Sequence, residues 1–269
     1  SEMCIRDRKE PVIDMPTRFV DFMRVLVPMA GDDTTPEGEQ VNIYGNHVGS
    51  WNFAATAYLN RWKVKIYYEH YFDDHSQMFF QYGRWKDGHI GLEITFPKNR
   101  FIDTFVYEGL GTKDQTGPML YDSFWGEFEE QISAKDNYYN HYLYQGWQHW
   151  GMGIGNPLLP GPIYNKNGQI TFISNRVLAH HIGFCGSPCQ SLSYRMLLSY
   201  SRHWGTYDNP LNEIKKQFNS LFEVTYAPQQ LKGWSFTVSG AMDRGSILGN
   251  NYGGMLVIRK QGIIKSGNK

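Results

Sequence analysis

The chain lacks any run of about 18 consecutive apolar residues, the length that marks a candidate transmembrane helix. This absence leaves two classes open: a soluble β-protein, and a membrane β-barrel, in which only alternate residues face lipid. Charged residues are also scarce, at 19% of the chain against about a quarter in an average protein. The 26 basic and 26 acidic side chains cancel, so no basic excess indicates a nucleic-acid partner or a polybasic membrane patch.

Cysteine is rare as well, with three in the chain. Cys4 falls in the octapeptide SEMCIRDR, which resembles a translated sequencing-adapter scar found at the ends of metagenome-derived genes. We therefore expect residues 1–8 to be non-native and the gene to be truncated upstream, so a missing signal peptide says nothing about the compartment. Cys185 and Cys189 lie in CGSPC, which predicts a tight turn. Either they form a turn-closing disulfide in an oxidising compartment, or they are two unpaired small residues.

Aromatic residues, by contrast, make up 16% of the chain, and they favour strands because they fit a pleated, half-buried surface. Apolar and polar residues alternate with a period of two, which predicts strands with two different faces. Trp51, Phe53 and Leu59, for example, alternate with Ser50 and Asn52. We predict about ten strands, most of them near the roughly 9–11 residues of a tilted membrane strand. They lie at 18–30, 47–59, 62–72, 89–96, 101–109, 171–184, 192–201, 217–226, 234–239 and 254–262.

The connections between these strands discriminate between the two classes. Long ones are predicted at 31–46, 73–88, 110–170 and 204–216, a medium one at 243–252, and short ones at 60–61, 97–100, 185–189 and 227–232. Short turns at one end and long loops at the other are typical of bacterial outer-membrane proteins. We therefore predict an all-β fold, an antiparallel transmembrane β-barrel over residues 9–264 with a tail at 265–269. The long loops are expected outside the cell, and the short turns and the C-terminus in the periplasm.

Charged side chains occupy polar positions of these predicted strands. We expect them to face the barrel interior and to pair there, because an unpaired charge in such a site is costly. This lumen network comprises Lys63, Lys65, Glu69, Glu93, Arg195 and Glu223.

The insert at 110–170 is too long to be an idle loop in a compact domain. Residues 122–133 within it have helical spacing, which predicts a short helix. Aromatic side chains interleaved with amides suit a sugar ring, whose C–H face stacks while its hydroxyls form hydrogen bonds. A self-packed plug or an interfacial aromatic belt is the equally favoured alternative. The glycan-binding candidates are Trp125, Tyr138, Tyr139, Tyr142, Tyr144, Trp147, His149 and Trp150.

Motifs for catalysis and cofactor binding are weak. GMGIG at 151–155 is close to a phosphate-binding glycine pattern but lacks the flanking strand and helix. Serine and histidine occur together at 47–51 and 195–204, without the pattern of an activated nucleophile. We therefore expect no catalytic residue, no metal and no cofactor.

Three stretches resemble the capsule-assembly Wzi family as it occurs in Bacteroidetes-type bacteria. They are DNYYNHYLYQGWQHWGMGIGNPLL at 136–159, NGQITFISNRVLAHHIGF at 167–184 and SYRMLLSYSRHWGTYDNP at 193–210, and YGNHVGSWNFAATAYLNRW at 44–62 is similar too. The resemblance implies a large outer-membrane barrel, of which the predicted strands form the C-terminal part. It also implies a surface lectin that attaches exported capsular polysaccharide to the cell.

The expected function is therefore a non-enzymatic outer-membrane lectin in capsule assembly. Its expected partners are capsular or other surface polysaccharide, outer-membrane lipid and lipopolysaccharide, and no nucleic acid. The first alternative is a diffusion porin whose long loop folds inward as a constriction. A less favoured alternative is an outer-membrane hydrolase.

Overall fold

The computed structural model describes residues 17–27, 29, 31–35, 47–73, 78, 86–99, 101–121, 134–141 and 147–262. Several features predicted above lie outside these residues: the adapter-like octapeptide, the helix at 122–133, the tail at 265–269, and the candidates Trp125, Tyr142 and Tyr144.

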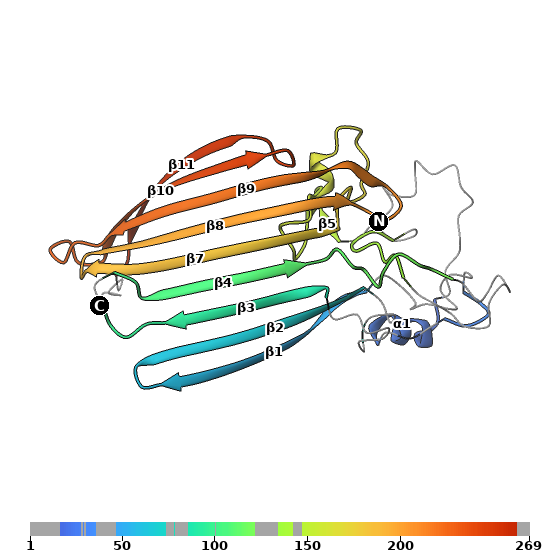
Figure 1. The fold of residues 1–269 in the computed structure, drawn as a ribbon, viewed down its shortest axis with the longest axis horizontal. Coiled ribbons are helices and arrows are strands. Elements are labelled where there is room, and N and C mark those ends of the chain that lie inside the picture. Colours follow the sequence, from blue (N-terminus) through green and yellow to red (C-terminus); the bar gives the residue numbers. More distant parts are fainter. Residues whose placement is uncertain are drawn as a thin grey trace, which may run out of the picture.

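Nine long strands form one antiparallel sheet (Figure 1). They are β1 (Val48–Leu59), β2 (Trp62–Asp73), β3 (Gly88–Thr95), β4 (Thr104–Gly111), β7 (Val177–Cys189), β8 (Leu192–Gly205), β9 (Pro210–Tyr226), β10 (Trp234–Gly245) and β11 (Asn251–Lys260). Each strand pairs with the next of these nine in chain order, β4 with β7 across the insert. The prediction of a mostly antiparallel β fold is confirmed. Among the described residues, no helix is long and apolar enough to cross a membrane.

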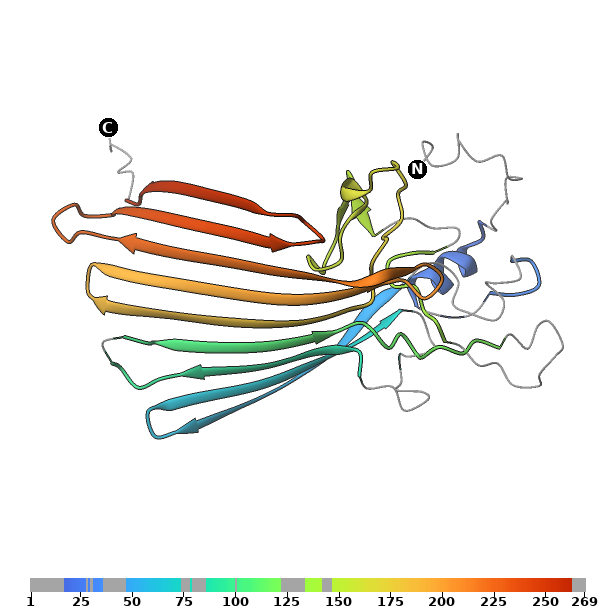
Figure 2. The ribbon, with the colours of Figure 1, turned by 45° about the horizontal axis from the view of Figure 1, so that its top comes forward.

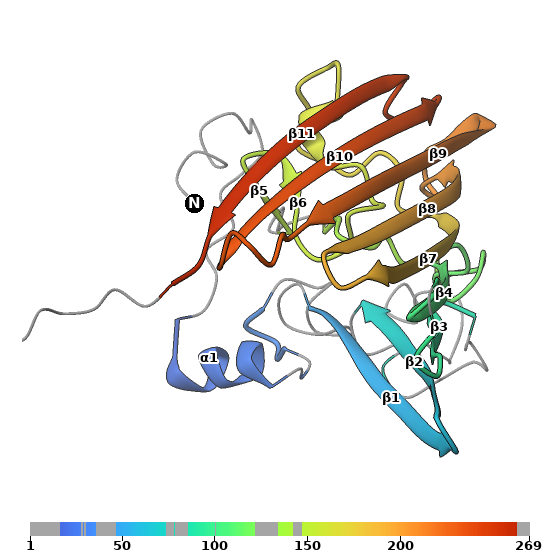
Figure 3. The same cartoon turned by 90° about the vertical axis from the view of Figure 1, so that its left-hand side faces the viewer.

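The sheet curves into an open trough, with β1 and β11 at its two free edges (Figure 2, Figure 3). The insert between β4 and β7 lies at one end of the trough and carries a small hairpin, β5 (Gln148–His149) and β6 (Met152–Gly153), followed by a 3-10 turn, η4 (Pro162–Tyr164). We call the described part of this insert, residues 112–121, 134–141 and 147–176, the plug. The plug end of the trough is therefore the end at which β4 finishes.

The first predicted strand, 18–30, is wrong. This segment contains the helix α1 (Phe19–Leu26). Its apolar residues at positions 19, 22 and 26 recur at the helical spacing i, i+3, i+7 and not with the period of two of a strand. The charged groups decide for the helix, because Asp21 accepts hydrogen bonds from the Arg18 backbone N–H (2.9 Å) and from its guanidinium.

CGSPC is not the tight turn predicted for it. Cys185 and Cys189 both belong to β7, and the turn falls at Gln190–Ser191, because Cys189 pairs with Leu192. The pairing register shifts between Gly186 and Cys189, which is a bulge that accommodates a proline inside a strand. Both thiols are free, so the structure has the unpaired alternative.

Two later connections are also shorter than predicted. The strands β8 and β9 are joined by residues 206–209, and β10 and β11 by 246–250. Polar residues at the strand ends caused the error, since they continue the ladder well beyond the predicted limits. Long connections therefore remain between β2 and β3 and between β4 and β7, while the turn predicted at Asn60–Arg61 is confirmed.

The two faces of the sheet differ in chemistry. One, here the polar face, carries residues such as Glu69, Glu108 and Ser199. The opposite one, here the apolar face, carries large apolar side chains that remain exposed, for example Phe53 (54%) and Leu256 (64%). Its other exposed members include Trp51, Leu59, Trp62, Ile66, Ile90, Ile182, Phe222, Val238 and Ile258. The apolar core lies instead between the plug and the polar face, where Tyr139 and Phe172 pack against Leu110 and Ala179.

Candidate functional site

Asp87, in the connection before β3, anchors the plug to the sheet. Its carboxylate is 1% exposed. It accepts hydrogen bonds from the backbone N–H groups of Asp114 (2.8 Å) and Gln115 (2.5 Å) and from the Tyr138 hydroxyl (2.9 Å). Burial raises the pKa of Asp87 to about 6, although these three donors oppose the rise. The carboxylate therefore fixes both the start of the plug and one of its tyrosines.

Buried amides join the two ends of the plug. Asn175 is fully buried. Its side-chain amide donates to the Tyr138 backbone carbonyl (2.9 Å), and its backbone carbonyl accepts from the Thr112 hydroxyl (2.6 Å). Asn140 makes a reciprocal pair with the Phe172 backbone, at 2.9 and 2.8 Å. These hydrogen bonds thus hold together segments of the plug that lie far apart in the sequence.

Aromatic rings form one wall of the site. The ring of Tyr139 stacks against Trp147, with centroids 6.1 Å apart and planes at 26°, and meets Phe172 edge-on at 5.1 Å. Its hydroxyl accepts a hydrogen bond from the Asn156 backbone N–H (2.9 Å). Packing and this bond together hold the wall in one orientation.

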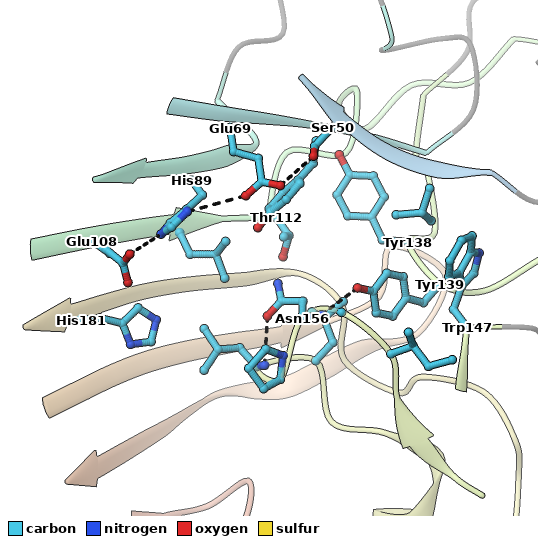
Figure 4. A pocket seen from close by; sticks show the side chains of 18 of the residues that line it. Ser50, Glu69, His89, Glu108, Thr112, Tyr138, Tyr139, Trp147, Asn156 and His181 are labelled. Atoms are coloured by element: carbon cyan, nitrogen blue, oxygen red, sulfur yellow. Dashed lines mark hydrogen bonds and ion pairs between the residues drawn. The ribbon is translucent and has the colours of Figure 1, made fainter. Parts of the chain in front are cut away.

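The sheet supplies a floor of carboxylates and imidazoles (Figure 4). His89 lies between two acids, with Nδ1 3.7 Å from Glu69 Oε2 and Nε2 3.5 Å from Glu108 Oε1. The Ser50 hydroxyl donates to Glu69 (2.6 Å), and the Tyr67 hydroxyl donates to Glu108. Ser50, Glu69, His89 and Glu108 all line the cavity beneath the plug (Figure 4).

Gly91 makes the contact between Tyr67 and Glu108 possible. Tyr67 on β2 pairs with Gly91 on β3, which pairs with Glu108 on β4. A Cβ atom at Gly91 would lie 2.0 Å from the tyrosine ring. Because Gly91 has no side chain, the ring crosses β3 and reaches the carboxylate two strands away.

The same row continues across β7 and β8. Glu108 is opposite His181, which is opposite Ser199. The imidazole Nδ1 of His181 and the hydroxyl of Ser199 are 2.6 Å apart. Three polar side chains from three strands therefore stand side by side.

A cavity of about 800 Å³ lies between the plug and this floor. This volume is in the range of small-molecule sites, about 300–1,000 Å³. Its walls are aromatic and aliphatic on the plug side and bear carboxylate, imidazole, hydroxyl and amide groups elsewhere. Among the described residues that line it, none is lysine or arginine.

The glycan-binding candidates divide into two groups. Tyr138, Tyr139 and Trp147 line the cavity together, but the two tyrosines are only 4% and 7% exposed. Their rings therefore hold the plug together, as the plug alternative predicts, and Trp147 is the more accessible ring. His149 and Trp150 lie at the tip of the β5–β6 hairpin, outside the cavity lining, and Trp150 is 81% exposed.

The charged residues predicted to face the interior all lie on the polar face. Lys63 pairs with Glu93 and Arg195 with Glu223, both at 3.4 Å. The Lys65 ammonium lies 5.2 Å from the centroid of the Tyr67 ring. Glu69 differs from these, because it lines the cavity and lies beside His89. Among the described residues, those around His89 included, no group of three or more His, Cys, Asp or Glu side chains could hold a metal ion.

Sequence reasoning missed part of the floor. His89 was assigned to a polar strand position without a role, and Glu108, His181 and Ser199 were not singled out as site residues. The alternation of polar residues was the available signal. It places such residues on one face but does not align strands that a long insert separates.

The chain was compared with protein-family models, with curated proteins and with solved structures, and none of them matches. The resemblance to the Wzi family therefore stays a prediction.

Proposed function

We propose that this chain is part of an outer-membrane β-barrel that binds surface polysaccharide in the cavity beneath its plug, as a non-enzymatic lectin in capsule assembly. The carrying observation is the cavity itself. It places aromatic rings opposite hydrogen-bonding groups, the combination that binds the C–H face and the hydroxyls of a sugar ring. The likeness of the plug and its flanking strands to the Wzi family supports the same function.

The apolar face supports the location. Soluble monomers rarely expose contiguous apolar patches beyond a few hundred Å², yet this face carries exposed aromatic and aliphatic side chains on most of its strands. Hydrocarbon would cover them. In the proposed barrel, additional strands pair with β1 and β11, because lipid tolerates no unpaired strand edge.

The chemistry of the polar face supports the proposal that this face is turned toward the interior of the barrel. The ion pairs of Lys63 and Arg195 and the acids of the floor suit a barrel interior, which is polar in outer-membrane proteins. The plug belongs at the extracellular mouth, since long connections lie there in such proteins.

Replacing one ring inside the cavity tests the proposal. Trp147→Ala removes the accessible ring of the wall, and we expect about fivefold weaker binding of capsular polysaccharide, since stacking contributes roughly 1 kcal/mol. Trp150→Ala is the matched control, because it removes an equal ring outside the cavity. Binding to the detergent-solubilised protein and retention of capsule on intact cells are measured. Equal binding by both variants and the wild type contradicts the proposal.

Two alternatives predict different results in the same preparations. A diffusion porin conducts ions across planar bilayers, with a conductance that capsule glycan leaves unchanged. Ester or glycan hydrolysis that Ser199→Ala abolishes would favour a hydrolase instead. The observation behind the second alternative is the short contact between Ser199 and His181, beside Glu108.

A further inference from the structure

We infer that the cavity selects sugar units without an acidic group, namely neutral or amine-bearing sugars, and discriminates against uronic acids and other anionic units. This inference rests on the proposed polysaccharide-binding function and names its substrate class. The juxtaposition of Glu69, His89 and Glu108 on the floor carries it.

The group of Glu69, His89 and Glu108 is negative in either state of its central imidazole. A neutral His89 has one N–H and leaves the two carboxylates with two negative charges. A protonated His89 forms an ion pair with each acid and still leaves one negative charge. The Ser50 and Tyr67 hydroxyls that donate to these acids are uncharged, so they satisfy oxygen lone pairs without cancelling charge.

The cations described on the polar face lie outside the lining of the cavity. Lys63 and Arg195 are paired with Glu93 and Glu223, and neither cation lines the cavity. Lys65 lies over the Tyr67 ring and is also outside the lining. Among the described residues of the lining, an anionic sugar in the cavity would therefore meet two carboxylates and no lysine or arginine.

The remaining groups suit an uncharged ring. Carboxylate oxygens accept strong hydrogen bonds from sugar hydroxyls or from an ammonium group. The Asn156 amide also lines the cavity, and Trp147 adds an aromatic surface. A sugar carboxylate about 6 Å from one of the acids would lose roughly tenfold to a hundredfold in affinity at the effective dielectric of a protein.

The test compares three probes of equal length: cello-oligosaccharides, chitosan oligosaccharides and oligogalacturonates. Each is titrated against the detergent-solubilised full chain at low and at high salt. The wild type should bind the neutral and amine-bearing probes at least about tenfold more tightly than the acidic probe. High salt should reduce this difference in affinity, because it screens the charges.

Glu69→Gln and Glu108→Gln remove one charge each and keep the carbonyl acceptor. Each should raise the affinity for the acidic probe, relative to the affinity for the neutral probe, by about fivefold or more. Glu223→Gln is the matched control, because it makes the same charge change on the same face outside the cavity. Its ratio of affinities should stay within about twofold of the wild type. Retention of the heat-modifiable band on gels shows that each variant is folded.

The outcomes separate the inference from the function beneath it. If the wild type binds the acidic probe as tightly as the neutral one, or if Glu108→Gln and Glu223→Gln change the ratio equally, the selectivity is refuted while polysaccharide binding stands. If no probe and no capsular polysaccharide binds the wild type, the proposed function fails and the inference fails with it.

Discussion

The two ends of the polar face treat their charges differently. Away from the plug, two acids have cationic partners, in the pairs Lys63–Glu93 and Arg195–Glu223. Beneath the plug, Glu69 and Glu108 share one imidazole and otherwise accept from neutral hydroxyls. An acid paired with a cation has a small free-energy penalty, whereas acids without a cation are typical of sites that interact with a ligand. The comparison thus separates the ion-paired part of the polar face from the proposed binding site on one continuous surface.

The largest expected effect comes from removing the anchor of the plug. Asp87→Ala leaves the buried N–H groups of Asp114 and Gln115 and the Tyr138 hydroxyl without their acceptor. We expect a loss of about 3–5 kcal/mol in the stability of the plug, because each orphaned donor costs about 1–3 kcal/mol. Limited proteolysis should cut the plug faster while the sheet stays protected. Equal loss of protection at both ends would mean that the two regions are not distinct.

A pH dependence at the same residue follows. Because the pKa of Asp87 in the folded plug is raised from 3.8 to about 6, the folded state binds the proton more tightly than the unfolded state. The plug is then most stable below about pH 4 with respect to this group and loses up to roughly 3 kcal/mol as the pH rises through 6. Protease protection of the plug between pH 4 and 7 measures this trend. Asp87→Asn should flatten it, and an unchanged slope in that variant would assign the dependence to another group.

Gly91→Ala tests the close contact between the Tyr67 ring and β3 beneath the plug. The added Cβ would clash with the Tyr67 ring and push its hydroxyl away from Glu108. We expect a cost of about 1–3 kcal/mol in the free energy of unfolding, typical of overpacking, together with weaker glycan binding. Gly240→Ala is the control, since a Cβ there has nothing within 4 Å. Urea unfolding in detergent should separate the two variants, and indistinguishable curves would contradict the tight crossing described here.

The sequence predicted local features of the fold better than distant ones. The turn at Asn60–Arg61 is set by adjacent residues, and Asn60 adopts the left-handed conformation (φ 56°) that asparagine tolerates. The helix α1 was mistaken for a strand although its apolar residues have helical spacing, and the ion pairs that favour the helix involve Asp32, which lies beyond it in the sequence. Proline and glycine in CGSPC indicated a turn, but the sheet accommodates them in a bulge.

The candidate site shows the same limit. Aromatic richness singled out Tyr139 and Trp147, which the structure brings together. The row from Glu108 to Ser199 depends on how β4 pairs with β7 across the plug, and a one-residue slip in that register would move those side chains to the other face. Alternation within each strand cannot supply this information.

The smallest expected effect lies at the end away from the plug. Arg195 is about half exposed, and its pair with Glu223 spans 3.4 Å. Arg195→Met should cost about 0.5 kcal/mol or less, because solvent screens such a pair, and glycan binding should stay unchanged. Urea unfolding and oligosaccharide titration measure the two quantities. A loss of neutral-sugar binding in Arg195→Met would show that the proposed site extends along the polar face beyond the cavity. The boundary between the ion-paired part of this face and the proposed binding site would then lie nearer the short turns.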